Sequence, residues 1–308
     1  MKMNSPTCAL LGDGRLHLQH GPIDLIIEAF AGAPREIELA YEQASMSFSS
    51  LLTNLVLELR RLRTPLSHDY PSFSDSVARR MARAVWPYRG NYITPMAAVA
   101  GAVADEMLHA MIAHRDLTRA YVNNGGDIAL HLSPGESFEV GIAGIEDAAL
   151  KGQFTIHAEG NVRGIATSGW RGRSFSLGIA DSVTVLASSA AEADAAATMI
   201  ANAVNIDHPN IQRVPACELY EDSDLGSLLV TRNVPVLDVE NIGRALNAGA
   251  HAAGNYLNSE LIERVALRLQ GHLRIVGRDC VGSMSHQIPT PSFPRALAQG
   301  NPVSFQAP

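Results

Sequence analysis

The chain has 308 residues, of which 46% are hydrophobic and 18% are charged, the profile of a globular protein with a sizeable core. Its formal net charge of −7 argues against a nucleic-acid surface or an anionic membrane as partner. No apolar run approaches a membrane span, and the start of the chain lacks the apolar core of a signal peptide. The 3 scattered cysteines are too few for a disulfide framework. We therefore expect a cytoplasmic protein.

The first part of the chain predicts a hairpin followed by helices. Residues 16–19 and 23–30 have the pattern of two strands around a Gly-Pro turn. Pro34 then opens a helical pattern that continues to about residue 63, with leucines at helical spacing. A short basic helix is expected over residues 74–86.

A second long helix is predicted over residues 96–114. Thr94 is its expected N-cap, and Pro95 occupies the first turn. Small residues on one side of this helix favour tight packing in the core, which is the interpretation we prefer. The alternative is that its free N-terminal amides receive a phosphate.

The middle of the chain has the pattern of several strands. A double glycine interrupts the strand pattern of residues 119–132, which indicates a β-bulge or a close backbone approach to another group. Residues 137–142 form a further predicted strand. Residues 154–158 and 162–166 are expected to pair with each other in antiparallel fashion.

The most informative stretch is a strand, residues 182–186, followed by an alanine-rich helix that reaches about residue 204. Ser189 and Glu192 have the spacing of a capping box at the start of this helix. Asp194 and Thr198 lie four residues apart and therefore share one face of it. Because an unpaired buried carboxylate is costly, Asp194 needs a partner, which is either a backbone amide or a hard cation.

The remaining elements are assigned from shorter patterns. Strands are predicted over 228–231, 234–237 and 273–276, and helices over 239–256 and 259–269. The resulting class is α+β, with a largely antiparallel sheet and long helices packed on one face. We expect a single domain over residues 1–282 and a Pro/Ser/Gln-rich tail over residues 283–308.

Three polar motifs of the chain read VNNGGDIAL, GIATSG and ADAAAT. Their order resembles the FAD:protein FMN transferase (ApbE) superfamily, whose double-glycine aspartate strand, Ala-Thr-Ser-Gly turn and Ala-Asp-x-x-x-Thr helix they match. The similarity is greater to its shorter, uncharacterised ApbE-related branch, for which the match extends from GRLHLQHGPIDL through ITPMAAVAGAVADE to SDLG.

This resemblance implies a ligand and a metal. It assigns Asp194 and Thr198 as ligands of Mg²⁺, and FAD or FMN as ligand or substrate. A metal beside a pyrophosphate neutralises developing charge, so that attack at phosphorus releases AMP. The residues implied to bind the flavin nucleotide are Asn124, Gly125, Gly126, Asp127, Thr167, Ser168 and Gly169.

Two departures from the transferases argue against transfer of FMN to a protein acceptor. Their longer segment with paired histidines is replaced here by residues 170–176, which run directly to Asp181, and a lipoprotein signal is not seen. Three interpretations remain: a metal-dependent transferase or hydrolase of a flavin or related nucleotide, a non-catalytic flavin-binding protein, and a hydrolase of a small cyclic or amide metabolite. A homo-oligomer is expected, because free sheet edges and apolar helices leave surface to cover.

Overall fold

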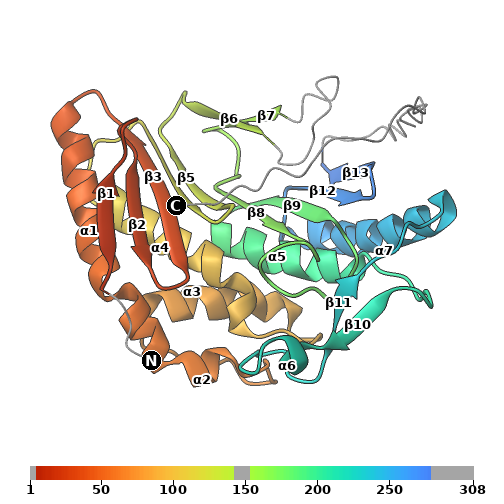
Figure 1. Cartoon of the computed structure of the whole chain (residues 1–308). Coiled ribbons are helices and arrows are strands. Elements are labelled where there is room, and N and C mark those ends of the chain that lie inside the picture. Colours follow the sequence, from red (N-terminus) through yellow and green to blue (C-terminus); the bar gives the residue numbers. More distant parts are fainter. Residues whose placement is uncertain (1–4, 142–152, 279–308) are drawn as a thin grey trace, which may run out of the picture.

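The computed structural model describes residues 5–141 and 153–278. Within these residues, nine strands form one antiparallel sheet in the order β1-β2-β3-β4-β5-β8-β9-β12-β13 (Figure 1). The predicted α+β class is confirmed. The strands of the sheet are β1 (Thr7–Leu10), β2 (Leu16–His20), β3 (Ile23–Phe30), β4 (Arg119–Asn124), β5 (Asp127–Leu132), β8 (Gly164–Ser168), β9 (Ser182–Ala187), β12 (Arg264–Leu269) and β13 (His272–Gly277).

The long helices pack on one face of this sheet (Figure 1). Strand residues such as Leu25, Val122 and Val185 share one buried core with Phe48 and Ile200 of the helices. The helical segments are α1 (Pro34–Leu57), α2 (Leu59–Leu62), α3 (Ser76–Val85), the 3₁₀ turns η1 (Trp86–Tyr88) and η2 (Pro95–Ala98), α4 (Val99–Ile112), α5 (Ala190–Ala203), α6 (Ala216–Leu219) and α7 (Val239–Asn258).

The other face of the sheet is partly covered by a two-stranded ribbon, β6 (Ser137–Gly141) and β7 (Gln153–His157). A smaller apolar cluster that includes Ile156, Ile165 and Leu186 lies there. A second ribbon, β10 (Gln212–Pro215) and β11 (Leu229–Asn233), stands apart from the main sheet. Side chains of one strand therefore alternate between two separate clusters, which decides where each polar residue points.

Three predictions about secondary structure are wrong. Residues 259–269 are not helical, because the short apolar run of β12 pairs with β9 and β13, and periodicity cannot distinguish so short a run from a buried helix. Residues 234–237 form no strand. The segments 154–158 and 162–166 do not pair with each other: β7 pairs with β6, whereas β8 pairs with β5 and β9.

Two helix ends also differ from expectation. The helix predicted over residues 34–63 is interrupted at Glu58, whose carboxylate accepts hydrogen bonds from the backbone N–H groups of Ser74 and Asp75. Thr94 is not a side-chain cap, because its hydroxyl donates to the Asp224 carboxylate. Long-range partners therefore set these boundaries.

The predicted tail at 283–308 lies outside the described residues, so the domain boundary stays a prediction. Among the helices that the structure describes, none has both the length and the apolar character that a bilayer crossing requires.

Candidate functional site

The double glycine forms the tight turn of the β4–β5 hairpin. Gly125 and Gly126 both have positive φ, +66° and +112°, a conformation that glycine adopts without steric cost. They are thus a two-residue turn and not the expected bulge, and Asn124 lies directly opposite Asp127. Asn123 stabilises the turn by accepting the Gly126 N–H at 2.8 Å.

Asn124 and Asp127 point toward the helices. Each lies two residues from a core residue on the helix side, Val122 or Ala129, and side chains two apart share a face. The Asn124 amide donates to the Ala100 carbonyl oxygen at 3.1 Å, which connects the end of β4 to the first turn of α4.

The Thr167–Gly169 motif is the end of strand β8 rather than a separate turn. The Thr167 N–H donates to the Asp127 carboxylate at 3.2 Å. Its hydroxyl lies on the other face of the sheet, 2.9 Å from the hydroxyl of Thr184. Ser168 shares the helix-side face with core residue Ala166. Thr167 therefore contributes its backbone, not its hydroxyl, on the helix side.

Asp194 lies on α5, the helix that packs on β8 and β9. The predicted start of α5 is confirmed: the Ser189 hydroxyl accepts the Glu192 N–H at 3.3 Å. Asp194 and Thr198 are both partly exposed, one helical turn apart. The Asp194 carboxylate accepts the Gly101 N–H at 3.1 Å.

The helices α4 and α5 cap each other. Asp194 of α5 accepts an N–H from the first turn of α4, and Asp105 of α4 accepts the N–H groups of Ala190 and Ala191 at 3.0 and 2.9 Å. Carboxylates stabilise helix N-termini through these otherwise unpaired amides. The backbone-amide alternative for Asp194 is thus realised, and the N-terminal amide of Gly101 is already paired rather than free for a phosphate.

Capping does not account for the second carboxylate beside Asp194. Burial, and then the nearby charge of Asp127, raise the pKa of Asp194 well above its usual range. Burial also raises the pKa of Asp127, opposed by the Thr167 N–H. Among the described residues, neither carboxylate forms an ion pair with a basic side chain. Two half-buried carboxylates that lie close together without a basic partner favour a shared proton or a bound cation between them.

A magnesium ion fits these donors better than a transition metal does. In the described part of the chain, no group of three or more His, Cys, Asp and Glu side chains could hold a metal ion, so an all-protein cage is not seen there. Mg²⁺ is commonly bound through one or two carboxylates, several waters and substrate phosphates. Asp127, Asp194 and the Thr198 hydroxyl are donors of this kind.

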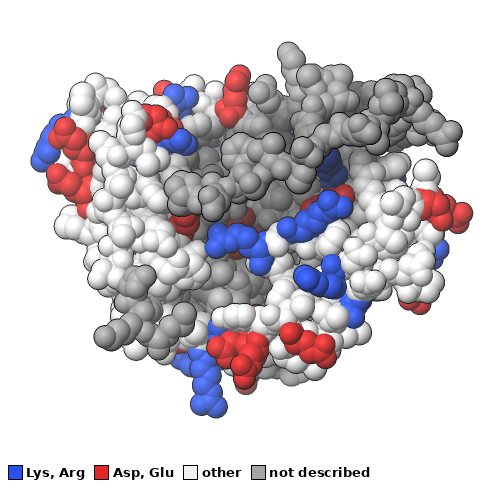
Figure 2. Space-filling view, in the orientation of Figure 1, with Lys and Arg blue, Asp and Glu red and all other residues white. Residues whose placement is uncertain are grey.

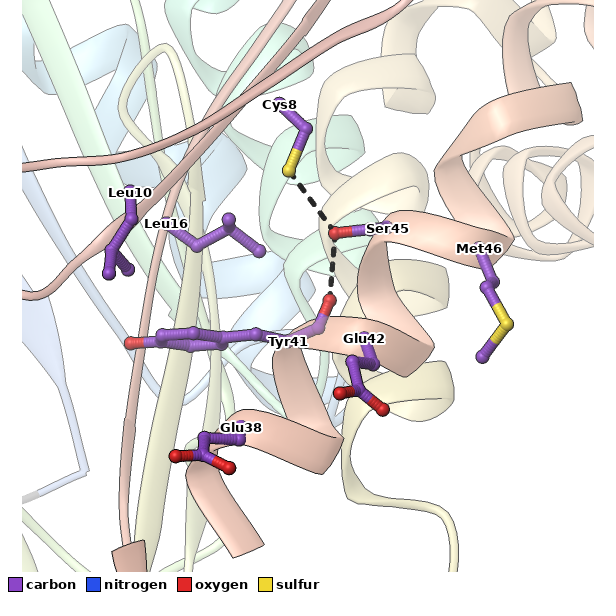
Figure 3. A pocket seen from close by; sticks show the side chains of 8 residues that line it. All are labelled: Cys8, Leu10, Leu16, Glu38, Tyr41, Glu42, Ser45 and Met46. Atoms are coloured by element: carbon purple, nitrogen blue, oxygen red, sulfur yellow. Dashed lines mark hydrogen bonds between the residues drawn. The ribbon is translucent and has the colours of Figure 1, made fainter. Parts of the chain in front are cut away.

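Two cavities lie away from these residues. One, of about 590 Å³, is lined by β1, β2 and α1, with Cys8, Tyr41 and Met46 among its walls (Figure 3). The other, of about 270 Å³, is lined by Asn161, Ser188 and three charged residues near the end of β13. Neither contains a residue predicted to bind the flavin or the metal.

The sequence missed two relations within the candidate site. The resemblance implies that Asp127 binds the flavin only, whereas the structure places it next to Asp194. Its position two residues before the core residue Ala129 is the sequence signal that its side chain points toward the helices. The reciprocal cap by Asp105 was also missed, because no local pattern links residues 105 and 190 before the helices are packed.

The antiparallel sheet, its one-sided helices and the motifs gathered at the ends of β4, β5 and β8 define an ApbE-like α+β protein. The chain belongs to the family described as "AbpE bacteria", whose model matches residues 8–275.

Similar proteins include UPF0280 proteins of methanogens. One from Methanopyrus kandleri is 38% identical over 146 residues, 47% of this chain but only 56% of the relative's length. One from Methanosarcina acetivorans is 32% identical over 186 residues, 59% of this chain and 70% of the relative. The match thus spans little more than half of the first relative.

Two solved structures are similar to this chain at lower sequence identity. An ApbE protein from Thermotoga maritima has a TM-score of 0.44 at 12% identity, covering 89% of this chain and 96% of the other. A variant of the flavin transferase ApbE from Vibrio cholerae has a TM-score of 0.38 at 14% identity, covering 85% and 96%. Similarity at this level defines no residue-by-residue equivalence.

Proposed function

We propose that the protein is a Mg²⁺-dependent enzyme that acts on the pyrophosphate of a flavin nucleotide and releases AMP from FAD. The observation that carries this proposal is the Asp127–Asp194 pair, two half-buried carboxylates that lie close together where α5 packs against β5 and that have no basic partner among the described residues. Membership of the ApbE-related family supports the nucleotide class.

The chain's own residues have distinct roles in this proposal. Asp127, Asp194 and the Thr198 hydroxyl would hold the cation. When bound, the cation would polarise the pyrophosphate and neutralise charge that develops on it. The exposed glycines of the β4–β5 turn leave room for a ligand beside Asp127, and the Thr167 N–H keeps that carboxylate in place. Residues 169–181 connect β8 to β9 directly, without the longer segment with paired histidines that the transferases have. We therefore propose water or a small molecule, not a protein, as the acceptor.

The test is AMP release from FAD in the presence and absence of Mg²⁺. Asp194→Asn should reduce the rate at least a hundredfold, because a neutral amide holds a hard cation poorly. Asp105→Asn is the matched control: it also removes a helix-capping carboxylate, but not one beside Asp127, and should retain the rate. Both variants are assayed below their melting temperatures. Equal loss of rate in the two variants would show that Asp194 acts only as a cap.

A non-catalytic flavin carrier is the second candidate. The Asp194–Gly101 hydrogen bond favours it, because a capping carboxylate needs no cation. A carrier would bind FAD, quench tryptophan fluorescence and release no AMP with or without Mg²⁺. Failure of the protein to bind either FAD or FMN would exclude both candidates.

A further inference from the structure

The segment that connects β8 to β9 is held firmly at both ends. The Trp170 N–H donates to the Ala180 carbonyl oxygen at 3.0 Å, and the Ile179 N–H donates to that of Val204 at 2.8 Å. Gly178 lies so close to α5 that an added Cβ would be 2.0 Å from the Ala201 oxygen. The exposed part of the segment is residues 171–174, which carries two arginines.

The two arginines have different electrostatic surroundings. The Arg171 Nε atom lies 3.2 Å from the Asp181 carboxylate, and its guanidinium group lies over the Trp170 ring at 5.1 Å. The charge of Arg171 is therefore compensated within its own segment.

Arg173 instead reaches two neighbouring turns, β2–β3 and β4–β5. Its Nη2 atom donates to the Pro22 carbonyl oxygen at the long distance of 3.4 Å. Its Nη1 atom lies 3.4 Å from the position that a Cβ on Gly125 would occupy. Among the described residues no carboxylate pairs with Arg173. An uncompensated guanidinium group thus lies against the turn that leads into Asp127.

Negative and positive charge are therefore separated within one site. The Asp127 and Asp194 carboxylates lie at the inner side of the hairpin, whereas Arg173 is exposed against its turn. Figure 2 shows basic side chains in the middle of the face of the molecule that is in view, with acidic atoms recessed beside them. A phosphate group bound to a cation on the carboxylates still has free anionic oxygens, and a guanidinium fork is well suited to contact them.

We propose that Arg173 contacts a phosphate of the bound nucleotide and makes the site select phosphorylated flavins over riboflavin. This inference rests on the proposed function. It makes Arg173 a specificity-determining residue, and it assigns no such role to Arg171.

The test is calorimetric titration, with Mg²⁺ present, of FAD, riboflavin and inorganic pyrophosphate into the wild type, Arg173→Ala and Arg173→Lys. Arg171→Ala is the matched control, an arginine of the same segment with its charge already paired. Loss of one charge-assisted hydrogen-bonding group should weaken FAD and pyrophosphate binding by about ten- to a hundredfold. Riboflavin binding should not change, Arg173→Lys should recover part of the affinity, and Arg171→Ala should bind like the wild type.

Equal weakening of FAD and riboflavin by Arg173→Ala would overturn the inference, because the side chain would then support the ring or the fold. An unchanged affinity for FAD would overturn it as well. If the wild type binds pyrophosphate in an Arg173-dependent manner but binds no flavin, the phosphate contact stands and the proposed flavin chemistry fails. If the wild type binds none of the three ligands, both fail.

Discussion

At the scale of single residues, Asp105 and Asp194 make nearly the same local contacts but have different surroundings. Each accepts backbone N–H groups from the first turn of the partner helix. The nearest charge that acts on Asp194 is the carboxylate of Asp127, whereas the charges that act on Asp105 are of both signs, from Arg80 and from Glu192. The difference between a structural carboxylate and a candidate metal ligand is therefore visible in the neighbours and not in the hydrogen bonds.

A pH-dependent contribution to stability is expected from Asp105. Burial raises its pKa to about 6, against the opposing effects of the Ala190 and Ala191 N–H groups and Arg80; Glu192 adds to the rise. Because the folded state binds this proton more tightly than the unfolded state does, the contribution of Asp105 to the free energy of unfolding falls as the pH rises from about 4 to 6.

The comparison is between the wild type and Asp105→Asn in urea denaturation at pH 5 and pH 7.5. The variant should lose about 1 kcal/mol at pH 7.5 from the weakened cap, and its deficit relative to the wild type should be larger at pH 5. A deficit that shrinks on acidification would contradict the assignment.

At the scale of elements, the contact of α4 with α5 depends on a glycine. A Cβ on Gly101 would lie 2.2 Å from the carbonyl oxygen of Ala190, a backbone atom that cannot rotate away. The same contact brings the Gly101 N–H to Asp194. The arrangement of the candidate site thus requires that these helices approach at backbone distance.

Gly101→Ala should therefore destabilise the protein by about 1–3 kcal/mol, the usual cost of overpacking. Gly243→Ala is the control, because Gly243 lies within α7 with nothing within 4 Å of its added Cβ, and alanine there should stabilise by about 0.5–1 kcal/mol. Thermal melting shows whether each substitution lowers or raises the melting temperature. Equal changes in the two variants would contradict the packing argument.

At the scale of the whole molecule, the two edges of the main sheet differ in protection. β13 carries Arg274, whereas β1 has neither a charged residue nor a proline, and all four of its residues are exposed. The side chain of Leu10 borders the cavity between β1 and α1 (Figure 3). Unprotected edge strands of this kind pair readily with another chain.

We propose that two copies of the chain pair through β1. Leu10→Lys should convert a dimer into a monomer in sedimentation velocity at micromolar concentration, because lysine at an edge opposes pairing. Val236→Lys, at a side chain that is 95% exposed and far from β1 in the sequence, should leave the dimer intact. A monomeric wild type, or dissociation by Val236→Lys alone, would contradict this interface.

The sequence by itself determined the elements with strong local signals. The hairpin of residues 16–30, the N-cap at Ser189, the long helices α1, α4, α5 and α7, and the α+β class follow from periodicity, capping residues and turn residues, all of which act between near neighbours. The order of the three polar motifs could also be read from the sequence, and it indicated the ApbE-related family.

The tertiary structure alone decided what those motifs touch. Strand pairing joins residues far apart in the chain, so the partners of β7, β8 and β12 had no local signature. The same holds for Asp127 and Asp194, which meet only when α5 packs on the face of the sheet beside β5, and for Arg173, which reaches Gly125 only after β8 and β9 are joined. Burial then raises the pKa of both carboxylates, because desolvation is a property of the packed molecule and not of the chain.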